Sequence, residues 1–221
     1  MKILEGKVVA LGSQGVGKTS IIMRYIGKSC NEHLSPTIGA SFFTCKLNLE
    51  NARIMLRVWD TAGQERFRSM APMYYRNANA AMLVFDLTQY NTFAAMKRWV
   101  TELRRNVEEV MTLVVIGNKS DLTKERQVDA EEGRVYATKI GASYYETSVL
   151  QNEGIKNVFL AIGNGLLKLS STECDSTSIR VYESTNLNWN NTDMLSTPII
   201  EESAQNPSIA HGMQERPYAC C

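Results

Sequence analysis

Three glycines and a lysine lie together in residues 11–20, LGSQGVGKTS, directly after the apolar run KVVA. Glycine inside regular structure is about 0.5–1 kcal/mol less stable than alanine. Such a cluster is therefore either an idle flexible loop or a place where the backbone must approach something closely. Residues 12–19 follow the pattern G-x-x-x-x-G-K-[ST], in which backbone N–H groups and a lysine surround a phosphate at a helix N-terminus. The pattern predicts a strand before this loop and a helix after it.

Short apolar runs alternate with amphipathic stretches along the first 169 residues. The expected buried strands are residues 7–12, 54–59, 80–87, 112–118 and 142–147. Residues 41–49 alternate in polarity and are expected to form a hairpin with 53–59. The expected helices are residues 17–26, 91–109, 129–140 and 153–169. This order predicts an α/β fold with helices on both faces of a mostly parallel six-stranded sheet that has one antiparallel edge strand.

Charge and composition divide the chain in two. Residues 1–169 carry 22 Lys and Arg against 16 Asp and Glu, whereas residues 170–221 carry two Arg against seven acids. The second part is rich in Ser, Thr and Asn and has no helical period, which predicts a disordered tail after a single domain of residues 1–169. Five irregularly spaced cysteines indicate no disulfide framework, and no signal peptide or long apolar run is evident. We expect a cytosolic monomer without a nucleic-acid partner.

Polar residues follow the ends of the first and third expected strands, where ligands of parallel sheets bind. Lys18 is expected to reach the β- and γ-phosphates, and the Thr19 hydroxyl to contact Mg²⁺. Asp60 closes an apolar strand and can hold a Mg²⁺-bound water, Gly63 frees an N–H for a γ-phosphate, and Gln64 can orient a water. The expected phosphate-binding residues of these two loops are Gln14, Gly15, Val16, Gly17, Lys18, Thr19, Ser20 and Gly63.

The loop after the fifth strand reads NKSD, residues 118–121. The Asp121 carboxylate can accept two hydrogen bonds from the N1–H and N2–H₂ groups of guanine, a donor pair that adenine lacks. Taken alone, NKSD would be read as a turn or a helix cap, and the glycine loop alone also suits an ATPase or a kinase. The expected guanine-binding residues are Asn118, Lys119, Asp121, Ser148, Val149 and Leu150.

The glycine loop, the loop that begins at Trp59, NKSD and the loop ETSVL at 146–150, in this order and spacing, resemble the Ras-like small GTPases over residues 5–169. SPTIGASF (35–42), WDTAGQERF (59–67) and MAPMYYR (70–76) are similar to the Rab branch, particularly its early-endosomal members. The resemblance implies that Thr37 contacts Mg²⁺ through its hydroxyl and the γ-phosphate through its N–H. It also implies that Phe42, Trp59 and Tyr74 present the nucleotide state to effectors, although composition alone would make them core or scattered surface aromatics.

The same resemblance implies a set of partners and a membrane anchor. The partners are GTP and GDP, an exchange factor, a GTPase-activating protein, a Rab escort protein, a GDP-dissociation inhibitor and effectors. Cys220 and Cys221 end the chain and, by the resemblance, carry two geranylgeranyl groups. The expected location is the cytoplasmic face of the early endosome or plasma membrane, with a cytosolic pool, and the expected role is in vesicle trafficking.

The chain departs from the family pattern at three places. Gln14 stands where a small residue is usual and would crowd a group inserted by an activating protein. Cys30 stands where a phenylalanine usually covers the guanine, which predicts faster nucleotide release unless Tyr25 or another ring replaces it. Ser148, Val149 and Leu150 replace the usual SAK, a minor change. An alternative function is a guanine-nucleotide-binding scaffold with negligible hydrolysis or constitutive GTP loading.

Overall fold

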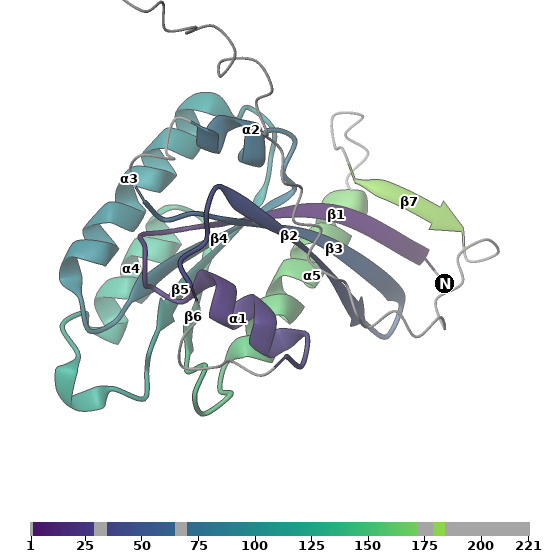
Figure 1. Cartoon of the computed structure of the whole chain (residues 1–221). Coiled ribbons are helices and arrows are strands. Elements are labelled where there is room, and N and C mark those ends of the chain that lie inside the picture. Colours follow the sequence, from purple (N-terminus) through teal and green to yellow (C-terminus); the bar gives the residue numbers. More distant parts are fainter. Residues whose placement is uncertain (1, 29–34, 65–69, 172–178, 184–221) are drawn as a thin grey trace, which may run out of the picture.

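A single β-sheet organises the molecule, for which the computed structural model describes residues 2–28, 35–64, 70–171 and 179–183 (Figure 1). Its strands are β1 (Lys2–Leu11), β2 (Ala40–Asn48), β3 (Ala52–Thr61), β4 (Ala80–Asp86), β5 (Thr112–Asn118), β6 (Ser143–Thr147) and β7 (Arg180–Glu183). The helices are α1 (Lys18–Tyr25), α2 (Ala71–Tyr75), α3 (Tyr90–Asn106), α4 (Ala130–Lys139) and α5 (Ile155–Ser171), with a 3₁₀ turn η2 (Thr123–Glu125).

The strand order β2-β3-β1-β4-β5-β6 is parallel except for the antiparallel pair β2–β3. The expected hairpin of residues 41–49 and 53–59 is therefore confirmed, and so is the α/β class. All seven residues of β4 are buried, as a central parallel strand covered on both faces requires. The carboxyl ends of β1, β4, β5 and β6 meet at one edge, which places their following loops together.

Two hydrophobic cores lie on opposite faces of the sheet. On β1, Leu4 and Val8 belong to a core that includes α1 and α5, whereas Val9 and Leu11 belong to a second core that includes α3 and α4. This division follows from the period-two alternation of side chains along a strand. Phe93, Met96, Val100 and Leu103 recur at spacings of three and four along α3 and are buried, and Val107 directly after the helix is partly buried.

The strand β7 corrects two predictions, because it adds a seventh strand and lies inside the expected disordered tail. It pairs antiparallel with the first part of β1, from Lys2 opposite Glu183 to Glu5 opposite Arg180. On this side of β1 the neighbouring strand β4 begins only opposite Val8, so the edge before it offers unpaired backbone groups. Ile179 packs into the core that includes α1 and α5. Residues 172–178 and 184–221 lie outside the described residues.

Two differences from the expected elements exceed the shifts of one to three residues that occur at most element ends. The strand β1 begins at Lys2 instead of residue 7, since its ladder with β3 runs from Lys2 opposite Ala52 onward and outweighs the polar local sequence. The five-residue helix α2 was not predicted. Within the described residues, no helix combines the length and apolarity that a membrane span requires.

Candidate functional site

The loop between β1 and α1 is shaped by glycines that other residues could not replace. Gly17 has φ +96°, and a Cβ there would collide with the side-chain nitrogen of Asn118. A Cβ on Gly12 would collide with the carbonyl oxygen of Val84. The helix α1 begins directly afterwards with no side-chain cap and no acidic residue in its first turn. Its first-turn N–H groups and positive dipole end therefore face the loop, which is the arrangement that binds phosphate.

A cavity of about 180 Å³ opens above this loop. Its lining comes from the glycine loop, from residues 35–37 and from the end of β3: Gln14, Gly15, Gly17, Lys18, Thr19, Ser20, Ser35, Pro36, Thr37, Gly63 and Gln64. Every residue predicted to bind phosphate lines it except Val16, whose side chain is fully buried in the core that includes α1. Three segments far apart in the sequence thus meet around one polar cavity.

Lys18 is the buried cation of this cavity, with only 6% of its surface exposed. Its ammonium group donates hydrogen bonds to the carbonyl oxygens of Gly12 at 2.9 Å and Ser13 at 3.0 Å. Burial lowers the pKa of Lys18 to about 8, an effect opposed by the charge of Asp60. These bonds hold the side chain along the loop, beside the place where a phosphate would bind.

Three oxygen-bearing side chains converge on the same side of the cavity. The Thr19 hydroxyl donates to Asp60 Oδ2 at 2.5 Å, the Thr37 hydroxyl lies 3.3 Å from the same oxygen, and the two hydroxyls are 3.0 Å apart. Asp60 is fully buried, and its Oδ1 has no hydrogen-bond partner among the described residues. Burial raises the pKa of Asp60, while the Thr19 hydrogen bond opposes this shift.

This oxygen set fits a magnesium ion. Hydroxyl and carboxylate oxygens are the ligands that Mg²⁺ prefers, and the ion usually takes only one or two carboxylates and completes its shell with phosphate and water. The described residues contain no cluster of three Asp, Glu, His or Cys side chains that could hold a metal alone. A site with one carboxylate therefore needs a phosphate ligand to be complete.

The segment after β3 lies directly against the glycine loop. A Cβ on Gly63 would collide with backbone atoms of Ser13 and Gln14, so only glycine fits at this point. The exposed Gln14 and the partly buried Gln64 both line the cavity beside it. The two residues whose roles in hydrolysis were predicted separately thus share one wall.

The predicted guanine-binding residues form a second group that does not line the phosphate cavity. Ser148 is fully buried, and its hydroxyl donates to Asp121 Oδ1 at 2.5 Å. Lys119 has φ +68°, and its ammonium lies 2.6 Å from Asp86 Oδ2. Val149 is partly buried, whereas Leu150 is 76% exposed. The contact between Asp121 and Ser148 joins two loops that are 27 residues apart.

Asn118 connects this group to the phosphate loop. Its amide donates to the Val16 carbonyl at 2.8 Å and its oxygen accepts from the Thr147 hydroxyl at 2.9 Å. The NKSD pattern predicts that Asn118 contacts the base, but it does not indicate this bridging role or the pairing of Lys119 with Asp86. Asp86 ends a buried strand as Asp60 does, which is the signal that would have indicated it.

The predicted aromatic triad is assembled on the adjacent surface. The Phe42 and Trp59 rings are 5.5 Å apart in an edge-on arrangement, and the Trp59 and Tyr74 rings are 5.8 Å apart. All three are half-buried, and the neighbouring side chains of Ile38 and Met73 are exposed by 81% and 70%. The triad thus joins β2, β3 and α2 into one apolar surface.

Two predictions about the base site have different outcomes. Tyr25 does not cover the base in this structure, because its ring stacks on Phe159 at 3.7 Å and its hydroxyl donates to the Lys46 carbonyl. The prediction about Cys30 lies outside the described residues, as do those about Cys220 and Cys221.

These features together define a purine-nucleotide-binding protein of the P-loop class. They are a glycine-lined phosphate cavity with a buried lysine, an oxygen set for Mg²⁺, and two loops joined by the Asp121–Ser148 hydrogen bond. The sequence pattern of the Ras family matches residues 7–168, and the chain belongs to this family of small GTPases. It is 49% identical over 164 residues to the Ras-related protein RabJ of Dictyostelium discoideum, covering 74% of this chain and 64% of RabJ. It is 44% identical over 167 residues to Ras-related protein Rab-21 of Bos taurus and of Homo sapiens, covering 76% of this chain and about three quarters of each relative. These relatives are Rab proteins, which confirms the expected similarity of the chain to the Rab branch.

Proposed function

We propose that the chain is a Rab-type molecular switch that binds GTP and GDP, hydrolyses GTP with Mg²⁺, and regulates vesicle trafficking at an endosomal membrane. The observation that carries the proposal is the convergence of Thr19, Thr37 and Asp60 beside the phosphate loop. Thr37 belongs to the segment that precedes β2, so a γ-phosphate and its cation would order that segment, and their loss would release it.

Each residue of the site has a separate role in hydrolysis. Gln64 orients the attacking water, whose oxygen bonds to the γ-phosphorus as the bond to the bridging oxygen of GDP breaks. Lys18, Gly63 and the N–H groups of the glycine loop stabilise the negative charge of the transferring group. Thr19, Thr37 and Asp60 would hold Mg²⁺, which neutralises phosphate charge when bound. The proton of the water leaves with inorganic phosphate.

The anchor and the partners are proposals as well. Cys220 and Cys221 would carry the prenyl groups, because two lipid chains give stable membrane attachment whereas one is marginal. An escort protein, a GDP-dissociation inhibitor, an exchange factor and effectors that read Phe42, Trp59 and Tyr74 complete the proposed cycle. The intact set of Lys18, Thr19, Thr37, Asp60 and Gln64 favours a cycling enzyme over a scaffold that does not hydrolyse GTP.

Single-turnover phosphate release from the GTP-loaded full chain tests this function. With Mg²⁺ we expect a rate on the order of 10⁻⁴–10⁻³ s⁻¹, because no arginine that could act in cis is among the described residues that line the site. Chelation of Mg²⁺ should slow hydrolysis at least about tenfold by removing the charge that neutralises the phosphates. A rate that does not depend on Mg²⁺, or no release above background, would contradict the proposal.

Gln14 gives a second prediction about the same reaction. Its side chain lies in the cavity wall beside Gly63 and Gln64, where an activating protein must insert its own group. We expect the replacements Gln14→Asn, Gln14→Ala and Gln14→Gly to raise the stimulated rate in that order, by roughly tenfold or more for glycine, since an inserted arginine accounts for 10³–10⁵ in rate.

Intrinsic hydrolysis is the control for this series, because it needs no inserted group. It should change by less than about threefold across the replacements. Equal stimulation of all four proteins by the same activating protein would show that Gln14 does not obstruct it.

A further inference from the structure

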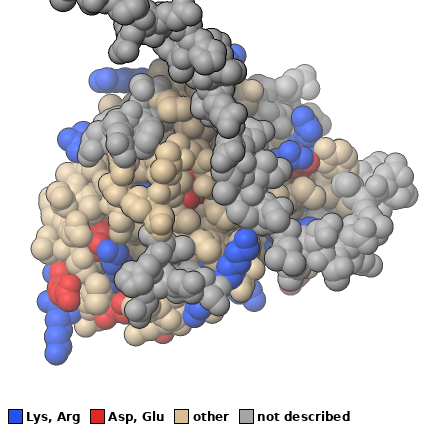
Figure 2. Space-filling view, viewed as in Figure 1, with Lys and Arg blue, Asp and Glu red and all other residues tan. Residues whose placement is uncertain are grey.

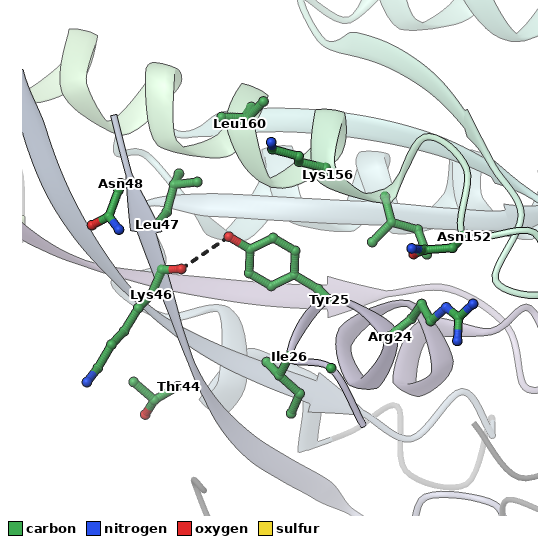
Figure 3. A pocket seen from close by; sticks show the side chains of 12 residues that line it. Arg24, Tyr25, Ile26, Thr44, Lys46, Leu47, Asn48, Asn152, Lys156 and Leu160 are labelled. Atoms are coloured by element: carbon green, nitrogen blue, oxygen red, sulfur yellow. Dashed lines mark hydrogen bonds between the residues drawn. The ribbon is translucent and has the colours of Figure 1, made fainter. Parts of the chain in front are cut away.

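A second cavity, of about 490 Å³, lies between α1, β2 and α5, away from the nucleotide site. Its lining comprises Arg24, Tyr25, Ile26, Gly27, Thr44, Lys46, Leu47, Asn48, Asn152, Ile155, Lys156 and Leu160, and we call it the α1–α5 groove. Figure 3 shows the Tyr25 ring at its centre, with Lys156 and Leu160 of α5 on one side and the strand β2 on another. None of these residues lines the phosphate cavity or belongs to the predicted guanine-binding group.

The base of the groove is apolar and held in place. Tyr25 is stacked on the fully buried Phe159 with an interplanar angle of 11°, and its hydroxyl donates to the Lys46 carbonyl at 3.2 Å. Leu47 and Ile155 are buried beside it, and Leu160 is partly buried. A preformed surface of this kind binds apolar side chains with little loss of its own conformational entropy.

The charged residues of the groove are all basic. They are Arg24, Lys46 and Lys156, and no carboxylate is among the described residues that line the cavity. In Figure 3, Arg24 and Lys156 lie on different sides of Tyr25. The Arg24 Nε is buried and has no hydrogen-bond partner among the described residues. On the face in Figure 2, Lys and Arg side chains border the area where α1 lies in Figure 1. The groove is therefore complementary to an acidic segment that also carries apolar side chains.

The chain contains such a segment after β7. Residues 193–202 read DMLSTPIIEE and combine four large apolar residues with three acids and no basic residue. Residues 184–192 carry no charge, and residues 203–221 carry one acid and one arginine, so neither flanking stretch has this composition.

The end of β7 lies within reach of the groove. Glu183 pairs with Lys2, Lys2 pairs with Ala52, and the next residue of β3, Arg53, pairs with Asn48 of the groove. Three inter-strand steps of about 4.8 Å make this separation about 14 Å. A flexible chain of 15 residues, from Glu183 to Pro198, has a root-mean-square span of roughly 20 Å. Tethering at this distance gives the segment an effective concentration in the millimolar range.

We propose that residues 193–202 occupy the α1–α5 groove of the same molecule, with Ile199 and Ile200 against Tyr25 and Glu201 and Glu202 near Lys156 and Arg24. The proposal does not depend on the proposed function, because neither the groove nor the segment contributes to the nucleotide site. It assigns a binding site to a segment of the tail that composition alone predicts to be disordered.

Photocrosslinking of the full-length protein tests this assignment. The photoreactive residue p-benzoylphenylalanine is incorporated in place of Ile199 and, as a matched control, in place of Ile209, and the crosslinked peptides are identified by mass spectrometry. From position 199 we expect crosslinks concentrated on α1, β2 and the first half of α5 within one chain. From position 209 we expect none that prefer this region.

Charge variants decide whether the contact is specific. Lys156 is exposed on α5, so Lys156→Glu should preserve the fold while reducing the crosslink yield at least about fivefold through like-charge repulsion. The matched control Lys139→Glu, on the exposed face of α4, should leave the yield unchanged. Glu201→Lys alone should restore the yield in the Lys156→Glu protein, because it recreates an opposite-charge pair and leaves Glu202 near Arg24.

Three results would overturn the proposal. They are crosslinks spread evenly over the surface, a yield that Lys156→Glu does not alter or that charge exchange does not restore, and crosslinks that join two chains. The last result would assign the groove to a second copy. Nucleotide binding measured on each variant confirms that it is folded.

Discussion

Replacement of Lys18 by alanine should weaken GDP binding by at least about 100-fold. The ammonium is the buried cation of the phosphate cavity, and removing one partner of a buried charge pair typically loses about 3–5 kcal/mol because the other charge is left uncompensated. The variant also leaves the carbonyl oxygens of Gly12 and Ser13 without their donor. Equilibrium titration with a fluorescent GDP analogue measures the change.

The matched control is Lys124→Ala, which removes an exposed lysine of η2 that lies outside the cavity. Its affinity should equal that of the wild type. Thermal unfolding without nucleotide separates loss of binding from loss of fold. An affinity within fivefold of the wild type in a folded Lys18→Ala protein would mean that the lysine does not contact phosphate.

Replacement of Asp121 by asparagine should reverse the choice of base. The two carboxylate oxygens can accept from the N1–H and N2–H₂ of guanine, whereas an asparagine amide opposes the second donor with a donor of its own. Xanthine carries a carbonyl at that position and accepts from the amide. Hydrogen bonds to a charged group contribute about 1.5–3 kcal/mol, so GDP affinity should fall roughly 10- to 150-fold, while affinity for xanthosine diphosphate should exceed that for GDP.

Competition between the two nucleotides for the same fluorescent probe measures this reversal. The hydrogen bond from Ser148 can be kept, because the asparagine oxygen still accepts it, and the loop should stay in place. Asp129→Asn is the control, since Asp129 caps α4 at an exposed position. Unchanged preference for GDP in Asp121→Asn would remove Asp121 from the base site and leave NKSD as a structural turn.

The most predictable parts of the fold were those in which local and tertiary signals agree. The buried strands β4 and β5 are continuous apolar runs, and α3 repeats apolar residues at spacings of three and four, so their pattern has one reading. The weakly predicted parts depend on distant partners. The first half of β1 contains Lys2, Glu5 and Gly6 and is a strand because β3 and β7 pair with it. The four residues of β7 carry too little pattern to stand out from a polar tail.

The candidate site shows the same division. Spacing alone indicated which residues follow the strand ends, because a parallel sheet brings those ends to one edge. The bridge from Asn118 to the Val16 carbonyl and the pair of Lys119 with Asp86 join residues 102 and 33 positions apart, and sequence spacing does not encode such contacts. The sequence allowed Tyr25 to cover the base in place of the usual phenylalanine, but packing against Phe159 holds its ring in the α1–α5 groove.

Local patterns in the chain were enough to predict the glycine loop, the order of strands and helices, and the polar residues that follow them, because these depend on local conformational freedom and hydrophobic period. The folded structure was needed to show that Thr19, Thr37 and Asp60 meet around one buried oxygen, that β7 completes the edge of β1, and that a basic groove lies between α1 and α5. Each of these joins segments from separate parts of the chain, and burial of the two cores on either side of the sheet brings those segments together.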